Sequence, residues 1–357
     1  MFRKRLENFS NYITPQIECL VKADANENLL ELPEELKDII LDTLKNSIPN
    51  LCFYPEINSQ PLKEALAKFY NLKSENFIVG NGSDQIIQLI VQACCEQDDQ
   101  VFFLYPSFTM YRITAELFDV GFCFFDITSQ WGIDVEKIID RIKTNEKIKV
   151  IFIDTPNNPT GIAWSAENLK ALVEAFPSKL VVIDNAYGEY SDIDYIEFAR
   201  RYNNTIILKT FSKIGFAGIR CGYGIANENV IKNLHKVKPP YNINILTQHI
   251  AIKVLENFEK LKNNIRIIKN ERDKMIQKLK EYYYVIQSEA NFVTVVDEYA
   301  DRIFEYLVAN KILVKKFEVG DKKLLRITLG KPQDNDIIIE NLIRFKKENA
   351  KDGAKSC

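Results

Sequence analysis

Histidine is nearly missing from this 357-residue sequence, which has only His235 and His249, both in one short segment. Two histidines are too few to favour a histidine-rich metal site or a serine–histidine–aspartate triad. We therefore expect no bound metal, and we expect any catalysis to depend on other residue types.

A charge excess, paired cysteines and long apolar runs are missing as well. The 47 basic and 49 acidic residues leave a net charge of -2, so the protein as a whole has no electrostatic attraction to nucleic acid or to an anionic membrane. The seven cysteines form no CxxC pair and the first residues lack a signal-peptide core, which favours the reducing cytoplasm. No apolar run approaches the length of about 18 residues that a membrane span needs. Small molecules are therefore the expected partners, with no nucleic acid and no membrane.

Short apolar runs alternate with amphipathic helical patterns along most of the chain. Strands are predicted at residues 76–80, 100–105, 121–127, 149–155, 180–185, 205–211 and 222–226. The helical patterns between them include residues 83–95 and 165–176, and the second begins at the capping-type residue Ser165. This strict alternation of strands and helices predicts a mostly parallel sheet between helices.

The pattern changes after Pro239 and Pro240, where a long charged helical stretch, residues 247–283, replaces the alternation. Short strands are then predicted at residues 292–298, 311–317 and 324–330. The expected fold class is α/β, with a large domain around a mostly parallel mixed sheet and a smaller α+β domain. The expected limits are an N-terminal arm over residues 1–30, the large domain over 31–240, the small C-terminal domain over 241–350 and a tail over 351–357.

Unusual residues follow the predicted strands, at the edge where doubly wound sheets bind ligands. The loop GNGSDQ leads into a helix whose amide groups would favour an anion such as phosphate. Asp184 ends the apolar run LVVIDN, where a carboxylate needs a partner, and Lys213 follows the run TIILKTF. Taken singly, these features also fit a helix-capping turn, a capping aspartate and a surface lysine.

Together, a phosphate loop, a buried acid and a strand-end lysine are the parts that a pyridoxal phosphate site requires. The lysine bonds to the aldehyde of the cofactor, the acid keeps the ring nitrogen protonated, and the loop holds the phosphate. The sequence therefore predicts a pyridoxal phosphate enzyme. A nucleotide-binding loop is a weaker reading, because GNGSD lacks both the GxGxxG spacing and a Walker lysine.

An ordered set of motifs resembles the aminotransferases of the aspartate aminotransferase fold (fold type I), and within them the histidinol-phosphate aminotransferase group. The set covers nearly the whole chain, from NYITP, ADANEN and FYPE through GNGSDQ, YPSFTMY, TPNNPTG, VVIDNAYGEY and TFSKIGFAGIRCGY to LRITLG. The resemblance implies pyridoxal 5'-phosphate as cofactor and a homodimer with shared active sites. It also implies amino transfer between glutamate or 2-oxoglutarate and a phosphorylated substrate, histidinol phosphate, in histidine biosynthesis.

The same resemblance implies a role for each matching residue. Lys213 would bond to the cofactor, Asp184 would pair with the ring nitrogen, and Tyr187 would donate to the phenolic oxygen. The phosphate would be held by Ser83, Asp84, Ser212 and Arg220. Phe108 would stack on the ring of the cofactor, and Asn157 would share the phenolic oxygen with Tyr187. Tyr54 would reach the phosphate site of the neighbouring subunit. The substrate side would be formed by Tyr12, Asn26, Asn157 and Arg326. Plain core packing is the alternative for Phe108 and Tyr187.

Three departures from the family pattern leave the substrate open. Ile337 stands where many relatives have a second basic residue. The spacing from Lys213 to Arg220 is one residue shorter than usual, which predicts a tightened loop. The segment between Tyr12 and Asn26 is short, and NENL replaces NENP. The alternatives are the same chemistry on another small phosphorylated ketone or amine and, outside enzymes, a binding or regulatory protein that keeps the fold.

Overall fold

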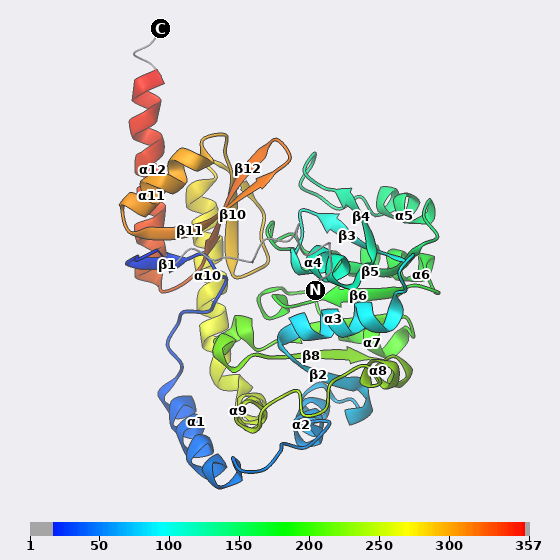
Figure 1. Ribbon diagram of the computed structural model, residues 1–357. Coiled ribbons are helices and arrows are strands. Elements are labelled where there is room, and N and C mark those ends of the chain that lie inside the picture. Colours follow the sequence, from blue (N-terminus) through cyan, green and yellow to red (C-terminus); the bar gives the residue numbers. More distant parts are fainter. Residues whose placement is uncertain (1–16, 354–357) are drawn as a thin grey trace, which may run out of the picture.

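The computed structural model describes residues 17–353, with side chains as far as residue 349. Two sheets organise the chain, and they lie side by side in Figure 1, the larger on the right and the smaller on the left. The larger sheet has the order β2-β8-β7-β6-β5-β3-β4. Its strands are β2 (Phe77–Asn81), β3 (Gln100–Tyr105), β4 (Gly121–Asp126), β5 (Ile148–Asp154), β6 (Leu180–Asp184), β7 (Thr205–Thr210) and β8 (Cys221–Ala226).

The larger sheet is mostly parallel, as predicted, because only β8 runs antiparallel to its neighbours β2 and β7. Each predicted strand is confirmed to within one residue at either end. Alternate side chains of a strand enter different cores: Ile151 and Ile153 of β5 pack in one core cluster, and Val150 and Phe152 pack in the other. Apolar residues fill both faces, so the sheet is covered on both sides by helices.

The helices around this sheet follow the predicted alternation. They are α3 (Gly82–Cys94), α4 (Met110–Phe118), α5 (Val135–Lys143), α6 (Ala166–Ala175), α7 (Ile196–Arg201) and α8 (Glu228–His235). Ser165 caps α6 as expected, since its hydroxyl accepts a hydrogen bond from the amide of Asn168 at 3.1 Å. Within residues 17–353, no helix is both long enough and apolar enough to cross a membrane.

The smaller sheet has the order β1-β11-β12-β10-β9, and residues of three helices share one core cluster with it. Its elements are β1 (Val21–Ala23), β9 (Tyr284–Ile286), β10 (Phe292–Val296), β11 (Ile312–Val319), β12 (Lys322–Thr328), α10 (Lys262–Leu279), α11 (Ala300–Ala309) and α12 (Pro332–Gly353). The three predicted strands are confirmed as β10, β11 and β12. The strands β1 and β9 were not predicted, because three residues are too few to show a period.

The long helical stretch predicted after the two prolines is divided. It forms α9 (Ile245–Glu256), a 3-10 turn (Phe258–Leu261) and α10. Helix α9 contacts α1 (Glu34–Ser47) and α2 (Gln60–Tyr70), and Val254 of α9 belongs to a core cluster of the larger sheet. The domain limits stay a prediction, and this packing favours a limit after α9 rather than before it.

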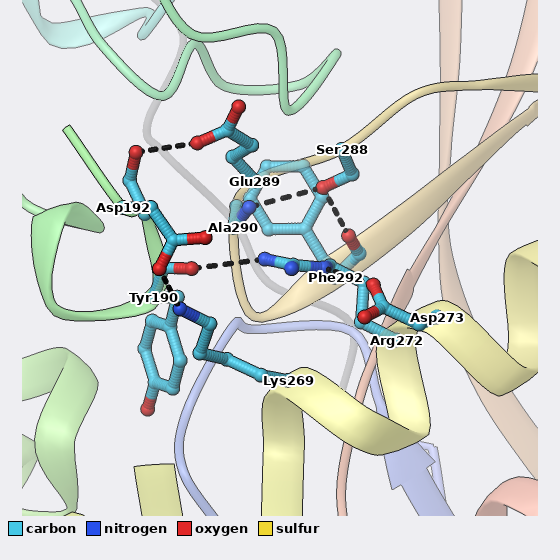
Figure 2. A network of polar contacts seen from close by, with 10 residues as sticks. Tyr190, Asp192, Lys269, Arg272, Asp273, Ser288, Glu289, Ala290 and Phe292 are labelled. Carbon is cyan, nitrogen blue, oxygen red and sulfur yellow. Dashed lines mark hydrogen bonds and ion pairs between the residues drawn. The ribbon is translucent and has the colours of Figure 1, made fainter. Parts of the chain in front are cut away.

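A polar network joins the smaller sheet to the segment that follows β6 (Figure 2). The buried Arg272 of α10 donates to the backbone carbonyl of Tyr190 at 2.9 Å. The hydroxyl of Ser191 donates to the carboxylate of Glu289 at 2.5 Å, from the loop between β9 and β10. Hydrogen bonds to charged groups are worth about 1.5–3 kcal/mol each. These contacts hold the small sheet against the loop that begins at Asp184.

Candidate active site

A pocket lies where β5, β6 and β7 end. Residues 82–84, at the start of α3, also line it, and Ala25 and Glu27 come from the segment after β1. Most residues predicted from the sequence for the cofactor line this pocket: Ser83, Asp84, Phe108, Asp184, Tyr187, Ser212, Lys213 and Arg220. The structure therefore brings together residues that are up to 137 positions apart, from Ser83 to Arg220.

The first turn of α3 forms the anion-binding end of the pocket. Gly82 has a φ of +74° and donates its amide to the carbonyl of Arg220 at 2.9 Å. A Cβ on Gly222 would lie 2.3 Å from the amide nitrogen of Ser83, so only glycine lets β8 approach the helix this closely. The side chain of Arg220 donates to Asp84 at 3.1 Å. The helix N-terminus and this guanidinium together favour a phosphate.

The loop after β7 presents Lys213 and Arg220 to the same pocket. It consists of two 3-10 turns, Ser212–Ile214 and Ala217–Ile219, with Gly215 between them at a φ of +107°. Arg220 ends the second turn at a φ of +51°, in the left-handed region. The chain thus reaches Arg220 from Lys213 through two tight turns in succession. Lys213 is half-buried, and its Nζ lies 5.6 Å from the ring centre of Tyr187.

Asp184 ends β6 with only 4% of its surface exposed. Its Oδ2 accepts a hydrogen bond from the hydroxyl of Tyr111 at 2.8 Å, and its Oδ1 accepts one from the amide of Ala186 at 3.2 Å. Burial raises the pKa of the Asp184 carboxyl to about 7, although the bond from Tyr111 opposes this rise. A buried carboxylate of this kind is stabilised by a cation placed in the pocket.

A second acid, Asp154, lies beside Asp184 and was not predicted as a site residue. The two are register partners at the ends of the parallel strands β5 and β6, and both line the pocket. Burial raises the pKa of the Asp154 carboxyl to about 6. A signal was present in the sequence, because the apolar run KVIFIDT carries an aspartate near its end just as LVVIDN does.

Asn157, predicted to contact the cofactor, is fully buried and is not among the residues that line the pocket. Its Nδ2 donates to Asp154 at 2.9 Å and to the carbonyl of Pro106 at 3.1 Å, and its Oδ1 accepts from the amide of Thr160 at 3.2 Å. The next residue, Asn158, lines the pocket instead. Adjacent asparagines in one turn look alike in sequence, and the hydrogen bonds of the turn decide which one faces the pocket.

Asn26 meets the pocket residue Tyr187. Its Nδ2 donates to the hydroxyl of Tyr187 at 2.9 Å, and its backbone amide donates to Thr328 at 2.9 Å. Asn26 has a φ of +54°, a conformation that asparagine tolerates better than most residues. Phe108, on the pocket wall, packs edge-on against Tyr111 with ring centres 5.7 Å apart. The packing and the pocket roles of Phe108 and Tyr187 are thus compatible.

Arg326 of β12 is buried and held from two sides. Its Nη1 donates to Oδ1 of Asn158 at 2.6 Å, and its Nη2 donates to the carbonyl of Asp24 at 2.6 Å. The guanidinium lies between two rings, 5.5 Å from the centre of Phe292 and 5.2 Å from that of Phe317. Arg326 therefore connects the small sheet to the edge of the pocket through Asn158.

Among the described residues, Tyr54 and Ile337 do not line the pocket. Tyr12 lies outside the described residues. Tyr54 is 81% exposed and stacks on Tyr241 with ring centres 4.8 Å apart. Ile337 is on α12 with 42% of its surface exposed.

The pocket fits pyridoxal phosphate by its chemistry. Asp184 offers a buried carboxylate to a ring cation, Lys213 offers an amine to an aldehyde, and the start of α3 with Arg220 offers donors to a phosphate. Each of these groups matches one functional group of the cofactor. Residues that could hold the cofactor are therefore present on one side of the pocket.

Comparison with known proteins agrees with this arrangement. A family profile described as Aminotransferase class I and II matches residues 20–342. The histidinol-phosphate aminotransferase of Pyrococcus furiosus is 37% identical over 350 residues, which cover 98% of this chain and 99% of that protein. The enzyme of the same name from Ruminiclostridium cellulolyticum is 35% identical over 350 residues, 96% of this chain and 97% of that protein.

Solved structures extend the likeness to three dimensions. Histidinol-phosphate aminotransferase from Sinorhizobium meliloti, in complex with pyridoxal-5'-phosphate, has a TM-score of 0.87, and the match covers 97% of this chain and 98% of that one. Its sequence identity of 21% supports a shared fold only. Since the family profile spans most of the chain and the curated relatives align along nearly their whole length, this chain belongs to the class I and II aminotransferases.

Proposed function

We propose that this protein is a cytoplasmic, pyridoxal phosphate-dependent aminotransferase that acts on histidinol phosphate and on glutamate or 2-oxoglutarate, in histidine biosynthesis. The main observation in support of the proposal is that Lys213, Asp184 and the start of α3 line one pocket. The names of the curated relatives support the substrate. The six cysteines of the described chain are free, which agrees with a reducing compartment.

Each residue has a physical task in this reaction. The bound cofactor withdraws electrons from the substrate carbon that loses a proton. Asp184 would pair with the protonated ring nitrogen. Lys213 Nζ would hold the cofactor through a covalent bond and, once the incoming amine of the substrate has displaced it, would be free to take up the proton of the substrate carbon. Asn26 orients the hydroxyl of Tyr187 through their hydrogen bond, and we assign to Asn158 the contact expected of Asn157.

Single-turnover rates with a panel of amines test the substrate. We expect glutamate and histidinol phosphate to convert the cofactor rapidly, and we expect phosphorylated amines without an imidazole to react more slowly. A faster reaction of one of these amines would favour the same chemistry on another phosphorylated substrate. No conversion by any amine would favour a binding or regulatory protein on this fold.

We expect Arg326→Ala to weaken both half-reactions. A single arginine would serve the anionic groups of both substrates in turn, because Ile337 offers no second charge. Each half-reaction should lose about 2 to 4 kcal/mol of transition-state binding, the scale for truncating one partner of a buried charge pair. Single-turnover kinetics in both directions measure these losses. The exposed Arg344 provides a control, and Arg344→Ala should leave both rates unchanged.

Tyr12→Phe separates the two substrates. The family resemblance assigns Tyr12 to the substrate side, where a phenol hydroxyl would serve a distal phosphate but hardly the α-carboxylate of glutamate. This variant should therefore slow only the half-reaction of the phosphorylated substrate. If Arg326→Ala spares glutamate while Tyr12→Phe impairs it, the shared role of Arg326 has to be abandoned.

We also propose a homodimer in which Tyr54 reaches the phosphate site of the partner. The supporting observation is a run of exposed apolar side chains on the segment between α1 and α2, where soluble monomers rarely expose so many. These residues are Leu51, Phe53, Tyr54 and Ile57, and Tyr241 stacks beside them. A second copy of the chain would cover this segment.

Tyr54→Phe should weaken cofactor binding about tenfold, the scale of one hydrogen bond to a charged group. Absorbance titration measures the affinity, sedimentation checks that the dimer persists, and Tyr284→Phe, an exposed tyrosine of the small sheet, is the control. Mixing Tyr54→Phe chains with Lys213→Ala chains should restore one normal site per mixed dimer, since each site takes Lys213 from one chain and Tyr54 from the other. Mixed dimers without a normal site would refute the shared site.

A further inference from the structure

Asp154 lines the pocket, yet none of the roles assigned above uses it. It is 3% exposed, and both of its carboxylate oxygens accept hydrogen bonds from nitrogen donors. Oδ1 accepts from Nδ2 of Asn157 at 2.9 Å, and Oδ2 accepts from the backbone amide of Asn158 at 2.9 Å. The hydroxyl of Ser107 adds a longer contact to Oδ1 at 3.3 Å. The carboxylate is thus bound to the turn of residues 155–161 that follows it in the chain.

This turn, in its own right, contacts the small sheet. The carbonyl of Pro159 accepts from the hydroxyl of Thr294 in β10 at 2.5 Å, and the carbonyl of Gly161 accepts from the amide of Glu289 at 2.8 Å. A Cβ on Gly161 would lie 2.2 Å from Oγ of Ser288, so the turn is pressed against the loop before β10. Figure 2 shows Ser288 and Glu289 on that loop.

The turn also carries the partner of Arg326. Oδ1 of Asn158 accepts from Nη1 of Arg326 at 2.6 Å, so a continuous path of hydrogen bonds runs from Asp154 through Asn158 to the guanidinium. A guanidinium binds a carboxylate through two parallel bonds only when its plane is correctly oriented. A shift in the turn would therefore rotate Arg326 away from the anion of the substrate.

We propose that Asp154 is a positioning residue for the substrate anion, because its carboxylate orders the turn that holds Arg326 in place. This inference rests on the proposed role of Arg326. The competing role is a second charge beside Asp184 that acts on the ring of the cofactor. The hydrogen bonds favour positioning, since both oxygens of Asp154 already accept from Asn157 and Asn158.

Asp154→Asn tests the inference. The variant keeps the shape of the side chain but turns an NH2 group toward a backbone or side-chain N–H donor, so one of the two bonds to the turn is lost. We expect the apparent dissociation constant of glutamate in single turnover, and that of the unreactive dicarboxylate maleate, to rise between about ten- and a hundredfold, the scale for a misplaced binding group. The limiting single-turnover rate should change less than about twofold, because Lys213 and Asp184 are untouched. The cofactor dissociation constant, measured by absorbance, should rise less than that of maleate, because Asn158 is only one of several cofactor contacts.

A double-mutant cycle separates this inference from the proposed function. If Asp154 acts through Arg326, Asp154→Asn adds no further loss of maleate binding in an Arg326→Ala background. Ser107→Ala, which removes only the longer contact, is the matched control and should bind maleate normally. Asp154→Ser, which keeps one acceptor, decides the matter if the asparagine variant does not fold.

Each other outcome overturns one specific statement. Additive losses in the double variant, or a slower limiting rate with unchanged glutamate affinity, would show that Asp154 does not act through Arg326. Normal maleate binding in Arg326→Ala alone would instead refute the role of Arg326 in the proposed function.

Discussion

Replacing Lys213 with alanine is expected to abolish amino transfer in a protein that still folds and still binds the cofactor without a covalent bond. Lys213 provides the amine among the described residues that line the pocket. The side chains of the neighbouring Ser212 and Arg220 bond to other residues, Thr210 and Asp84. Without that amine, neither the covalent bond to the aldehyde nor the proton transfer from the substrate can occur. Single-turnover absorbance measures the loss.

Lys213→Arg is the matched control for charge. Arginine keeps the positive charge but is not deprotonated in proteins, so this variant should be equally inactive. Borohydride reduction of the native enzyme followed by peptide mapping should place the cofactor on Lys213. Recovery of the label on a different lysine would show that the assignment is wrong.

Asp184→Asn is expected to cost roughly 10²- to 10³-fold in rate, the scale of losing one preorganised electrostatic contact. An asparagine cannot balance the charge of a protonated ring nitrogen, so the cofactor withdraws electrons less strongly. Tyr111→Phe removes the 2.8 Å hydrogen bond but keeps the carboxylate, and it should be much less harmful. Near-normal turnover of Asp184→Asn would exclude the proposed role.

Thermal melts of the cofactor-free protein at different pH values independently test the raised pKa of Asp184. Burial raises its pKa from 3.8 to about 7, so between these values the folded protein holds a proton that the unfolded chain has released. The free energy of unfolding contributed by this group therefore falls as pH rises through that window. Asp184→Asn should remove this part of the pH dependence, while the part that comes from Asp154 remains. Identical pH dependence in the two proteins would contradict the raised pKa.

Much of the architecture follows from local sequence patterns. The strands of the larger sheet were predictable because runs such as VFFL and LVVI are apolar enough to be buried on both faces, and they end in polar or glycine-rich segments. The positions of Lys213, Asp184 and Ser83 followed from the rule that parallel strands end at one edge. These predictions depend only on residues adjacent in the chain.

The tertiary structure alone decided other features, because they depend on contacts between distant residues. Strand β1 exists because Val21 pairs with Ile312, and helix α9 joins the larger sheet because α1 and α2 cover it. Asn158 rather than Asn157 faces the pocket because the buried carboxylate of Asp154 and the carbonyl of Pro106 engage the amide of Asn157. The direction of a side chain in a turn is set by such partners, and a motif records only the residue types.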